Sequence, residues 1–492
     1  MKIRALRAAV LLLCAAALGT ACQTRIDNAT HKEAVRALID STPTWVDRGA
    51  LGKRLWKVQQ QFYESRGYLP AWIDGVETTP HWKDLVQQLK YAEAHGLDPA
   101  RYGVAEFETL RDQSQDRWRG TQFPMERVPE MDAKMTYAYL RYAADLLGWT
   151  RSPREVHQNW LTDSKKEDLA ARLTEAIANH RIRESLEQLA PTHPQYKGLQ
   201  AALAREAQAP SGRADVIKMN MERWRWAPRD LGDRYILINV PAYTMQVVEN
   251  NAPALAMRVI VGEPDNQTPL FSDEMTYIVF SPFWNIPPGI LRDETLPRAA
   301  NDPDFLRRNN IEVVGTSGDE EFDPSAIDWS DPEATKGLRF RQRPGADNAL
   351  GLVKFIFPNH FNVYLHDTPG DKLFFREKRA LSHGCIRVED PIALARYVLR
   401  NQPQWTETRI RNAMNARQEQ TVKLKETLPV HIGYWTAWVE PDGQTVTYTD
   451  DPYRIDPRHA ALRGVKLAET GRQSSFRFTQ PGIRARAARS AR

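Results

Sequence analysis

The sequence predicts an α+β protein in which an α-helical N-terminal scaffold domain is followed by a mixed, β-rich domain with a long insertion. Three observations support this fold class. Apolar residues recur at helical spacing between about residues 32 and 203, and they form short strand-like runs from residue 235 onward. The chain has 492 residues, too many for one compact core, so two or three domains are expected.

The first residues have the pattern of an export signal. Basic residues begin the chain, residues 8–18 are apolar, and small residues precede Cys22. The apolar run is too short to cross a bilayer. We therefore expect residues 1–21 to be a signal peptide and residues 22–31 to be a linker, with the mature body exported to the periplasm.

Residues 18–22, Leu-Gly-Thr-Ala-Cys, resemble a bacterial lipobox, in which the cysteine receives a lipid and becomes the mature N-terminus. We expect lipidation of Cys22, which would tether the protein to a membrane. The alternative is ordinary cleavage after Ala21. Gln23 follows the cysteine in place of Asp, and this favours the outer membrane.

The count of thiols makes Cys385 a candidate nucleophile. The chain has three cysteines, and Cys14 would leave with the signal peptide while Cys22 would be lipidated or lie in the linker. Exported proteins usually pair their cysteines or avoid them. A single remaining thiol is therefore better explained by reactivity than by the alternative, an inert buried cysteine.

Helical spacing defines the scaffold domain, residues 32–207. Pro191 and Pro194 interrupt the helical pattern near its end. The expected helices contain residues 35–39 and 55–62 and span residues 131–147, 169–180 and 182–189.

A linker, residues 208–218, leads to the β-rich domain, residues 219–425. The expected strands are residues 235–240, 243–248, 255–262, 275–280, 353–357 and 362–366, and a helix follows at 391–400. Residues 286–350 lack a clear period and are rich in Pro, Asp, Asn and Gly, which is typical of a functional loop or lid. Residues 426–480 form a C-terminal extension, and residues 481–492 a basic, solvated tail.

The charge balance gives no support for nucleic-acid binding. The formal net charge is +5, and it falls by three when the basic residues of the signal peptide are removed.

The residues with the most evident chemistry are His366, in a strand-like run, and the tetrapeptide Ser382-His383-Gly384-Cys385. Acyl transfer by a cysteine needs a base for its proton and donors for the oxyanion. His366 and His383 are both candidates for the base, and Gly384 lets a backbone N–H approach a substrate carbonyl. The competing interpretation is a zinc site built from these residues and His360. No tight ligand pair such as CxxC supports it, so we expect no metal and no cofactor.

A histidine followed at a distance by Ser-His-Gly-Cys-Ile resembles the signature of the L,D-transpeptidase (YkuD-type) family. Arg387 stands where many members have Asn, which resembles the larger, YcbB-type branch. The resemblance extends from about Lys32 to Asp456 and includes Asn-Met-Glu-Arg-Trp at residues 220–224. That branch usually carries a peptidoglycan-binding module before this segment. Residues 204–215 are too few to hold one, so the chain is expected to lack it.

The resemblance implies roles for individual residues. Cys385 matches the nucleophile, His366 the proton acceptor and donor, and Gly384, with Cys385, the backbone oxyanion hole. Substrate contacts are expected from Ser382, His383, Arg387, Tyr364 and Trp284. Arg387 could bind a substrate carboxylate or, equally, pair with Glu389 or Asp390. Trp284, Trp224 and Trp226 could stack on sugars, although core packing is the more common role. Residues 286–350 resemble the family's capping subdomain.

The family's reaction acts on peptidoglycan stem peptides, as donor and as acceptor, in cell-wall biogenesis and cell shape. The resemblance implies a Cys thioester on a tetrapeptide stem, release of D-Ala and transfer to an amine to give 3→3 cross-links. It also implies covalent inhibition by carbapenems. The alternatives are an L,D-carboxypeptidase or endopeptidase on the same peptides, and a non-catalytic wall-binding lipoprotein.

Overall fold

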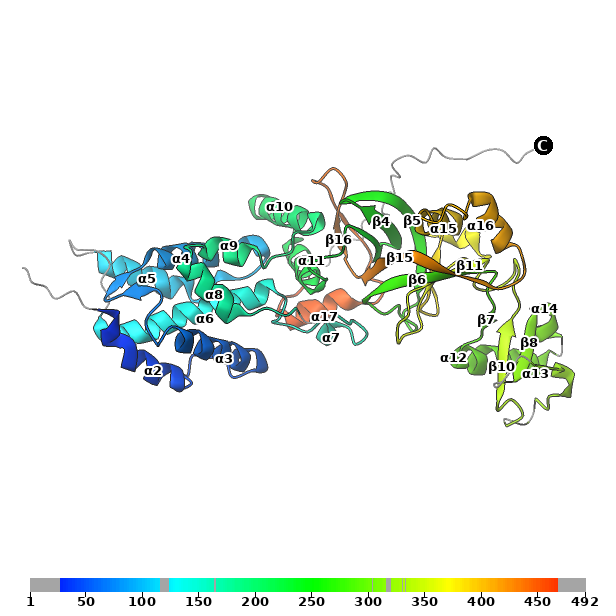
Figure 1. Ribbon diagram of the computed structural model, residues 1–492, viewed down its shortest axis with the longest axis horizontal. Helices are drawn as coiled ribbons and strands as arrows, with labels where there is room; N and C mark the ends of the chain where they lie inside the picture. Colours follow the sequence, from blue (N-terminus) through cyan, green and yellow to red (C-terminus); the bar gives the residue numbers. More distant parts are fainter. Residues whose placement is uncertain are drawn as a thin grey trace, which may run out of the picture. The chain divides into compact units, whose positions relative to one another are not determined.

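The computed structural model describes residues 27–115, 124–162, 165–302, 304–315, 320–329, 331 and 333–467 (Figure 1). The chain divides into two compact units. The first contains the chain up to Thr150 and Lys166–Ala190, and the second contains Arg151–Lys165 and the chain from Pro191. The expected signal peptide, Cys22 and the basic tail lie outside the described residues. Within the described ranges, no helix has the length and apolar character needed to cross a membrane.

The first unit is helical apart from a short hairpin. Its longest helix, α6 (Val128–Leu146), is buried around almost its whole circumference, as expected of a helix at the centre of a bundle. The amphipathic helices around it bury one face each. The other elements are α2 (Lys32–Asp40), α3 (Ala50–Ser65), β1 (Ile73–Asp74), β2 (Glu77–Thr78), α4 (Pro80–Tyr91), α5 (Val104–Gln115), α8 (Leu169–Ala178) and α9 (Ile182–Glu187).

The second unit is built on a nine-stranded mixed sheet. Strand β4 pairs with both β3 and β5, so the sheet closes on itself. Its alternate side chains, such as Ile278, Phe280 and Phe355, point into one apolar core. The strands in chain order are β3 (Arg234–Asn239), β4 (Thr244–Glu249), β5 (Ala252–Gly262), β6 (Ser272–Phe280), β11 (Val353–Ile356), β12 (Leu365–His366), β13 (Ala380–Ser382), β14 (Ile386–Val388) and β15 (Gln420–Gly433).

Helices and a second hairpin complete this unit. The helices are α7 (Pro153–Val156), α10 (Pro194–Gln208), α11 (Ala214–Trp226), α15 (Pro391–Val398), α16 (Glu407–Met414) and α17 (Ile455–Leu462), and the hairpin is β16 (Ala437–Val439) with β17 (Val446–Tyr448). Helix α11 begins inside the expected linker, and β15 crosses the expected domain end at residue 425. Trp224 stacks on Trp435 with ring centroids 4.3 Å apart, and Trp226 meets Trp160 edge-on at 5.1 Å, so both tryptophans are core residues.

The insertion between β6 and β11, which we call the cap, is a small folded subdomain. Its four strands lie in the order β7-β10-β8-β9, and it has an apolar core of its own around Val313 and Phe340. The Asn348 amide donates to the carbonyls of Pro282, at 3.1 Å, and Arg343, at 3.0 Å, and so ties the entry of the cap to its exit. Its elements are β7 (Trp284–Asn285), α12 (Pro288–Ile290), the π-helical turn η5 (Leu291–Thr295), α13 (Leu296–Asn301), α14 (Phe305–Arg308), β8 (Ile311–Gly315), β9 (Glu321–Phe322) and β10 (Leu338–Gln342).

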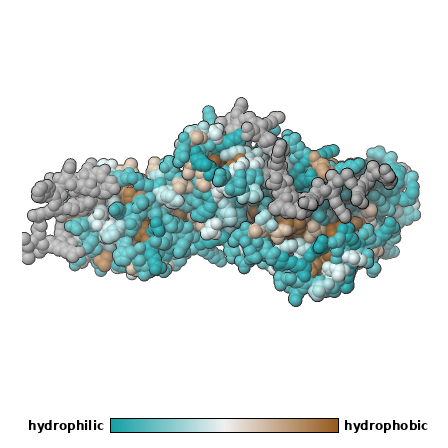
Figure 2. All heavy atoms as spheres, turned by 90° about the horizontal axis from the view of Figure 1, so that it is seen from above, coloured by the Kyte–Doolittle hydropathy of each residue, from teal (hydrophilic) through white to brown (hydrophobic). Residues whose placement is uncertain are grey.

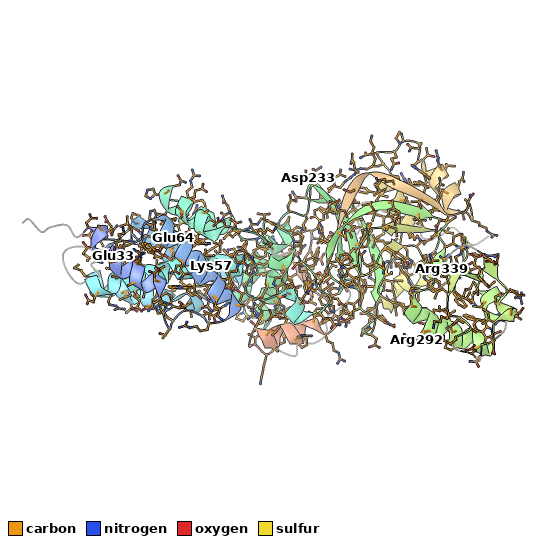
Figure 3. All side chains as sticks on the ribbon, turned by 60° about the horizontal axis from the view of Figure 1, so that its bottom comes forward. Glu33, Lys57, Glu64, Asp233, Arg292 and Arg339 are labelled. Carbon is orange, nitrogen blue, oxygen red and sulfur yellow. The ribbon has the colours of Figure 1, made fainter. Side chains whose placement is uncertain are left out.

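The fold class predicted from the sequence is confirmed: a helical N-terminal scaffold precedes a β-rich domain. On the face drawn in Figure 2, hydrophilic residues cover most of the visible surface and hydrophobic ones appear in scattered patches. Charged side chains labelled in Figure 3, such as Lys57 and Glu64 on α3 and Arg292 in the cap, are exposed.

Candidate active site

Two short parallel strands bring the candidate catalytic residues together. Strands β12 and β14 pair with His366 opposite Arg387. Because successive side chains of a strand point to opposite faces, the residues two positions earlier on each strand share the face of this pair. The opposite face carries Leu365 and Ile386, which are fully buried in the core. The other face of this ladder therefore carries four of the predicted site residues together, namely Tyr364, His366, Cys385 and Arg387.

The thiol of Cys385 lies at the start of β14. Its Sγ is 3.9 Å from the carbonyl oxygen of Asn362, a residue held in the left-handed region at φ +55°. Burial raises the pKa of the Cys385 thiol, and hydrogen bonds from Tyr364 and the charge of Arg387 offset this rise only in part. The resting thiol is therefore protonated at neutral pH and needs a base to become a nucleophile.

His366 is arranged to act as a neutral base. Its Nδ1 donates to the carbonyl oxygen of Asp367 at 2.6 Å, which places the proton of the neutral ring on Nδ1 and leaves a lone pair on Nε2. Burial and the charge of Arg387 lower the pKa of His366 to about 3, although the Asp367 and Leu350 carbonyls act in the opposite direction. The neutral form of His366 is thus favoured.

Two hydroxyls hold the loop that carries the thiol. Ser382 Oγ donates to the carbonyl of Cys385 at 2.5 Å and accepts the N–H of Gly384 at 3.2 Å. Thr268 Oγ1 donates to the carbonyl of Gly384 at 2.8 Å and accepts the N–H of Gly262 at 2.8 Å. Gly384 itself has φ +112°, a conformation that essentially only glycine adopts. The loop is therefore fixed from both sides of the thiol.

These contacts concern two residues for which the sequence predicted a role, and both roles stay predictions. Ser382 was expected to bind substrate, but its side chain is buried and both of its hydrogen bonds lie within the loop. Gly384 was expected to offer its N–H to an oxyanion, but that N–H already donates to Ser382. The backbone N–H of Cys385 remains as the donor from this loop, and Gly384 contributes its left-handed turn.

His383 points to the cap. Its Nε2 lies 2.7 Å from Oε1 of Glu294, in the turn η5, and 41 % of its side chain is exposed. Of the two candidate bases, His366 is the one that shares the Cys385 face of the β12–β14 ladder. His383 instead connects the catalytic loop to the cap.

Arg387 has no ion-pair partner among the described residues. Glu389 is bound by Arg258, whose Nε donates to it at 3.0 Å, and Asp390 accepts the N–H of Ala393 at the start of α15, at 2.8 Å. The Nε atom of Arg387 is buried without a hydrogen-bond partner. The alternative in which Arg387 pairs with Glu389 or Asp390 is therefore wrong.

Trp284 packs against the apolar core of the cap.

Three positions were not assigned a role from the sequence. Lys354 on β11 pairs with His366 across an antiparallel ladder and so shares its face, a placement set by the register of the two strands. Thr268 holds the catalytic loop, and the Tyr453 hydroxyl accepts the N–H of Thr268 at 3.1 Å and donates to the carbonyl of Gly262 at 2.7 Å. No local pattern predicts a contact between residues so far apart in the chain.

Among the residues that the structure describes, no three His, Cys, Asp or Glu side chains converge as metal ligands would. The ring of His360 packs against Phe361, with centroids 3.9 Å apart.

Comparison with known proteins identifies both parts of the chain. Residues 233–432 match the L,D-transpeptidase catalytic domain, and residues 57–203 match a family described as the scaffold domain. A Haemophilus influenzae protein provisionally named an L,D-transpeptidase is 29% identical over 401 residues, which are 79% of this chain and 76% of that protein.

Two solved structures of mycobacterial proteins are also similar. An L,D-transpeptidase from Mycobacterium smegmatis is 13% identical, with a TM-score of 0.19, over 41% of this chain and 58% of that one. L,D-transpeptidase 1 of Mycobacterium tuberculosis is 12% identical, with a TM-score of 0.16, over 41% of this chain and 60% of that one. Residues 233–432 therefore form an L,D-transpeptidase catalytic domain, and residues 57–203 form a scaffold domain that precedes it in the chain.

Proposed function

We propose that this protein is a peptidoglycan L,D-transpeptidase that works through a thioester on Cys385. The observation that carries the proposal is the register of β12 and β14, which sets a neutral imidazole and a buried thiol on one face. The family membership of residues 233–432 supports the same activity and peptidoglycan as the substrate.

In the first step, His366 Nε2 takes the proton of the Cys385 thiol as Sγ attacks the carbonyl between the third and fourth residues of a tetrapeptide stem. A C–S bond forms, and the C–N bond to D-Ala breaks. The proton on His366 passes to the departing amine. The N–H of Cys385 is the loop donor available for the developing oxyanion.

In the second step, an amine from a neighbouring stem attacks the thioester. A C–N bond forms, the C–S bond breaks, and His366 moves a proton from the amine to the departing sulfur. The product is a 3→3 cross-link. If water replaces the amine, the same residues perform a carboxypeptidase or endopeptidase reaction. The cap contacts the catalytic loop through Glu294, and a closed cap would favour the amine by excluding water.

The test is incubation of the purified protein with disaccharide-tetrapeptide, followed by mass spectrometry of the protein and the products. We expect an acyl adduct on Cys385, free D-Ala and a cross-linked dimer, and no reaction with Cys385→Ala. Tripeptide without dimer would show a hydrolase, and the absence of both adduct and D-Ala would refute the proposal.

The role of His366 is tested with a carbapenem as acyl donor. His366→Ala should lose acylation of Cys385 by more than about a hundredfold, the scale of general-base catalysis. His383→Ala is the matched control, because His383 contacts the cap, and it should retain acylation. Unchanged acylation in His366→Ala would move the base to another group.

We also propose that the protein is exported and that Cys22 is lipidated. The support is the basic and apolar start of the chain and the lipobox-like segment. Metabolic labelling with a fatty acid should mark the full chain but not Cys22→Ser, and the labelled protein should fractionate with the outer membrane. Label on the Cys22→Ser chain, or a soluble unlabelled native chain, would exclude lipidation.

A further inference from the structure

A row of charge crosses the face of the sheet that carries Cys385. Lys354 lies opposite His366 on β11, and Arg387 lies opposite His366 on β14, so the two cations flank the base. Neighbouring strands are about 4.8 Å apart, which places the backbones of the two cations about 10 Å apart. Cys385 precedes Arg387 by two residues on the same face, about 7 Å along the strand.

The positive charge of this row is only partly compensated. Lys354 Nζ lies 3.8 Å from Oε2 of Glu419, and the same oxygen also accepts the N–H of Phe283 at 2.8 Å. Arg387 has a buried Nε without a partner, and the acidic residues that follow it are occupied elsewhere. Among the described residues, Lys354 therefore shares its one carboxylate with a backbone N–H, and Arg387 has no carboxylate within ion-pair distance.

An uncompensated cation in a partly buried site is costly, and a bound anion would offset that cost. The guanidinium fork of an arginine fits a carboxylate in a bidentate manner. Burial also lowers the pKa of His366, and both cations lower it further, so the base stays neutral and does not compete for the anion. The row therefore places a neutral imidazole between two cations that could bind an anion.

We propose that Arg387 and Lys354 bind a carboxylate of the donor stem peptide and so restrict the enzyme to donors that are anionic next to the scissile bond. This inference rests on the proposed function and adds to it the charge of the substrate. Two carboxylates of a stem can lie there: the terminal carboxylate of the departing fourth residue, and a side-chain carboxylate on the diamino acid at position three.

The test measures binding separately from turnover. Cys385→Ala protein is titrated by calorimetry with three tetrapeptides: one with both carboxylates free, one amidated at the C-terminus, and one amidated at the side chain of residue three. We expect one amidation to weaken binding by about tenfold to a hundredfold, the strength of a charged hydrogen bond, and this identifies the carboxylate that is bound. Equal affinity for all three peptides would overturn the proposal.

Variants assign the effect to the two cations. In the Cys385→Ala background, Arg387→Gln should bind the free and the amidated peptides equally, Lys354→Gln should reduce the preference, and Arg387→Lys should keep part of it. Arg396→Gln and Lys83→Gln are matched controls, since Arg396 is exposed on α15 and Lys83 is exposed on α4. A preference that survives in Arg387→Gln and Lys354→Gln together would refute the assignment.

Release of D-Ala by the native protein separates this inference from the proposed function. Carboxylate-dependent binding without D-Ala release would sustain the charge preference and refute the transpeptidase. Equal rates of D-Ala release from free and amidated donors would support the proposed enzyme activity and refute the charge preference. Thermal unfolding of each variant identifies any that lose the fold. If Arg387→Gln is unfolded, Arg387→Lys is compared with the native chain instead.

Discussion

At the candidate active site, the pKa shifts of Cys385 and His366 favour the neutral form of both groups. Burial raises the pKa of Cys385, while burial and neighbouring cations lower the pKa of His366. A thiolate–imidazolium pair would need the opposite shifts. In the mechanism proposed above, proton transfer would therefore be part of the attack rather than a step completed before the substrate arrives.

This arrangement predicts the pH dependence of alkylation by iodoacetamide, a neutral probe. The rate for Cys385 should be low at pH 7 and rise with pH beyond the range of an ordinary thiol, because the thiol pKa is raised. Arg387→Gln should move the rise to higher pH, since Arg387 lowers that pKa. Mass spectrometry of timed samples measures the rate. A plateau already reached below pH 7 would contradict the neutral resting pair.

Thr268 is expected to be as sensitive as the catalytic residues, although it does not touch the thiol. Thr268→Val removes the hydroxyl that satisfies the Gly384 carbonyl and the Gly262 N–H in a buried site. We expect a loss of about 1–3 kcal/mol in the free energy of unfolding and a lower kcat/KM. Thr268→Ser keeps the hydroxyl and should restore both. Urea unfolding and D-Ala release provide the two measurements, and an unaffected Thr268→Val chain would show that the loop is held by other contacts.

Among the secondary structure elements, the cap is distinctive because it has its own core. Phe340 on β10 is 1% exposed and packs in that core, apart from the core of the large sheet. Phe340→Ala should destabilise the cap by about 3–5 kcal/mol, the usual cost of truncating a buried aromatic ring. Hydrogen exchange should accelerate in β8 and β10 while β6 and β15 remain protected. Uniform acceleration through both sheets would show that cap and sheet unfold as one unit.

The sequence predicts elements whose pattern is long enough to show a period. Helix α6 and strand β5 appear close to their expected positions because each repeats its pattern over many residues. The strands of the cap have two to five residues, too few for alternation to stand out, so the sequence indicated only an aperiodic lid. The closure of the sheet through β4 and β5 depends on pairing that no single segment reveals.

In the candidate site, too, some residues could be predicted from a local motif and others could not. Cys385 and His366 carry their chemistry in a recognisable local motif, and their positions could be proposed from it. The position of Lys354 beside His366 depends on the register of β11 against β12, and the hydrogen bonds of Ser382 depend on the turn at Gly384. Contacts set by register and turn geometry follow from the fold, so the sequence did not reveal that Ser382 supports the loop.

Across the catalytic unit, a buried carboxylate ties together distant parts of the chain. Glu222 on α11 accepts hydrogen bonds from Arg463 and from Arg151, the latter at 3.0 Å, and His459 lies 3.3 Å away. Burial alone would raise the pKa of Glu222, but the neighbouring His459 and the charge of Arg463 bring it well below its ordinary value. The charged form of this glutamate is therefore favoured by folding.

This shift predicts acid sensitivity. A depressed carboxyl pKa contributes stability that is fully present above the unfolded value, about 4.3, and is lost as pH falls toward the folded value. The urea midpoint of the native chain should therefore fall below about pH 4.3. Glu222→Gln should lower the free energy of unfolding at pH 7 by about 3–5 kcal/mol and so lower the urea midpoint. The midpoint of this variant should also change less as the pH falls. An equal acid slope in both chains would assign the sensitivity to other carboxyls.

The hydrogen bonds of Tyr453 to Gly262 and Thr268 have a consequence for the order in which the enzyme becomes active. Chains are synthesised from the N-terminus, so Cys385 is made before Tyr453, whose hydroxyl holds Thr268 and Gly262. A fragment that ends between Cys385 and Tyr453 would contain the thiol but lack the hydrogen bonds of Tyr453 to Gly262 and Thr268. The support of the thiol is therefore complete only when the chain includes Tyr453.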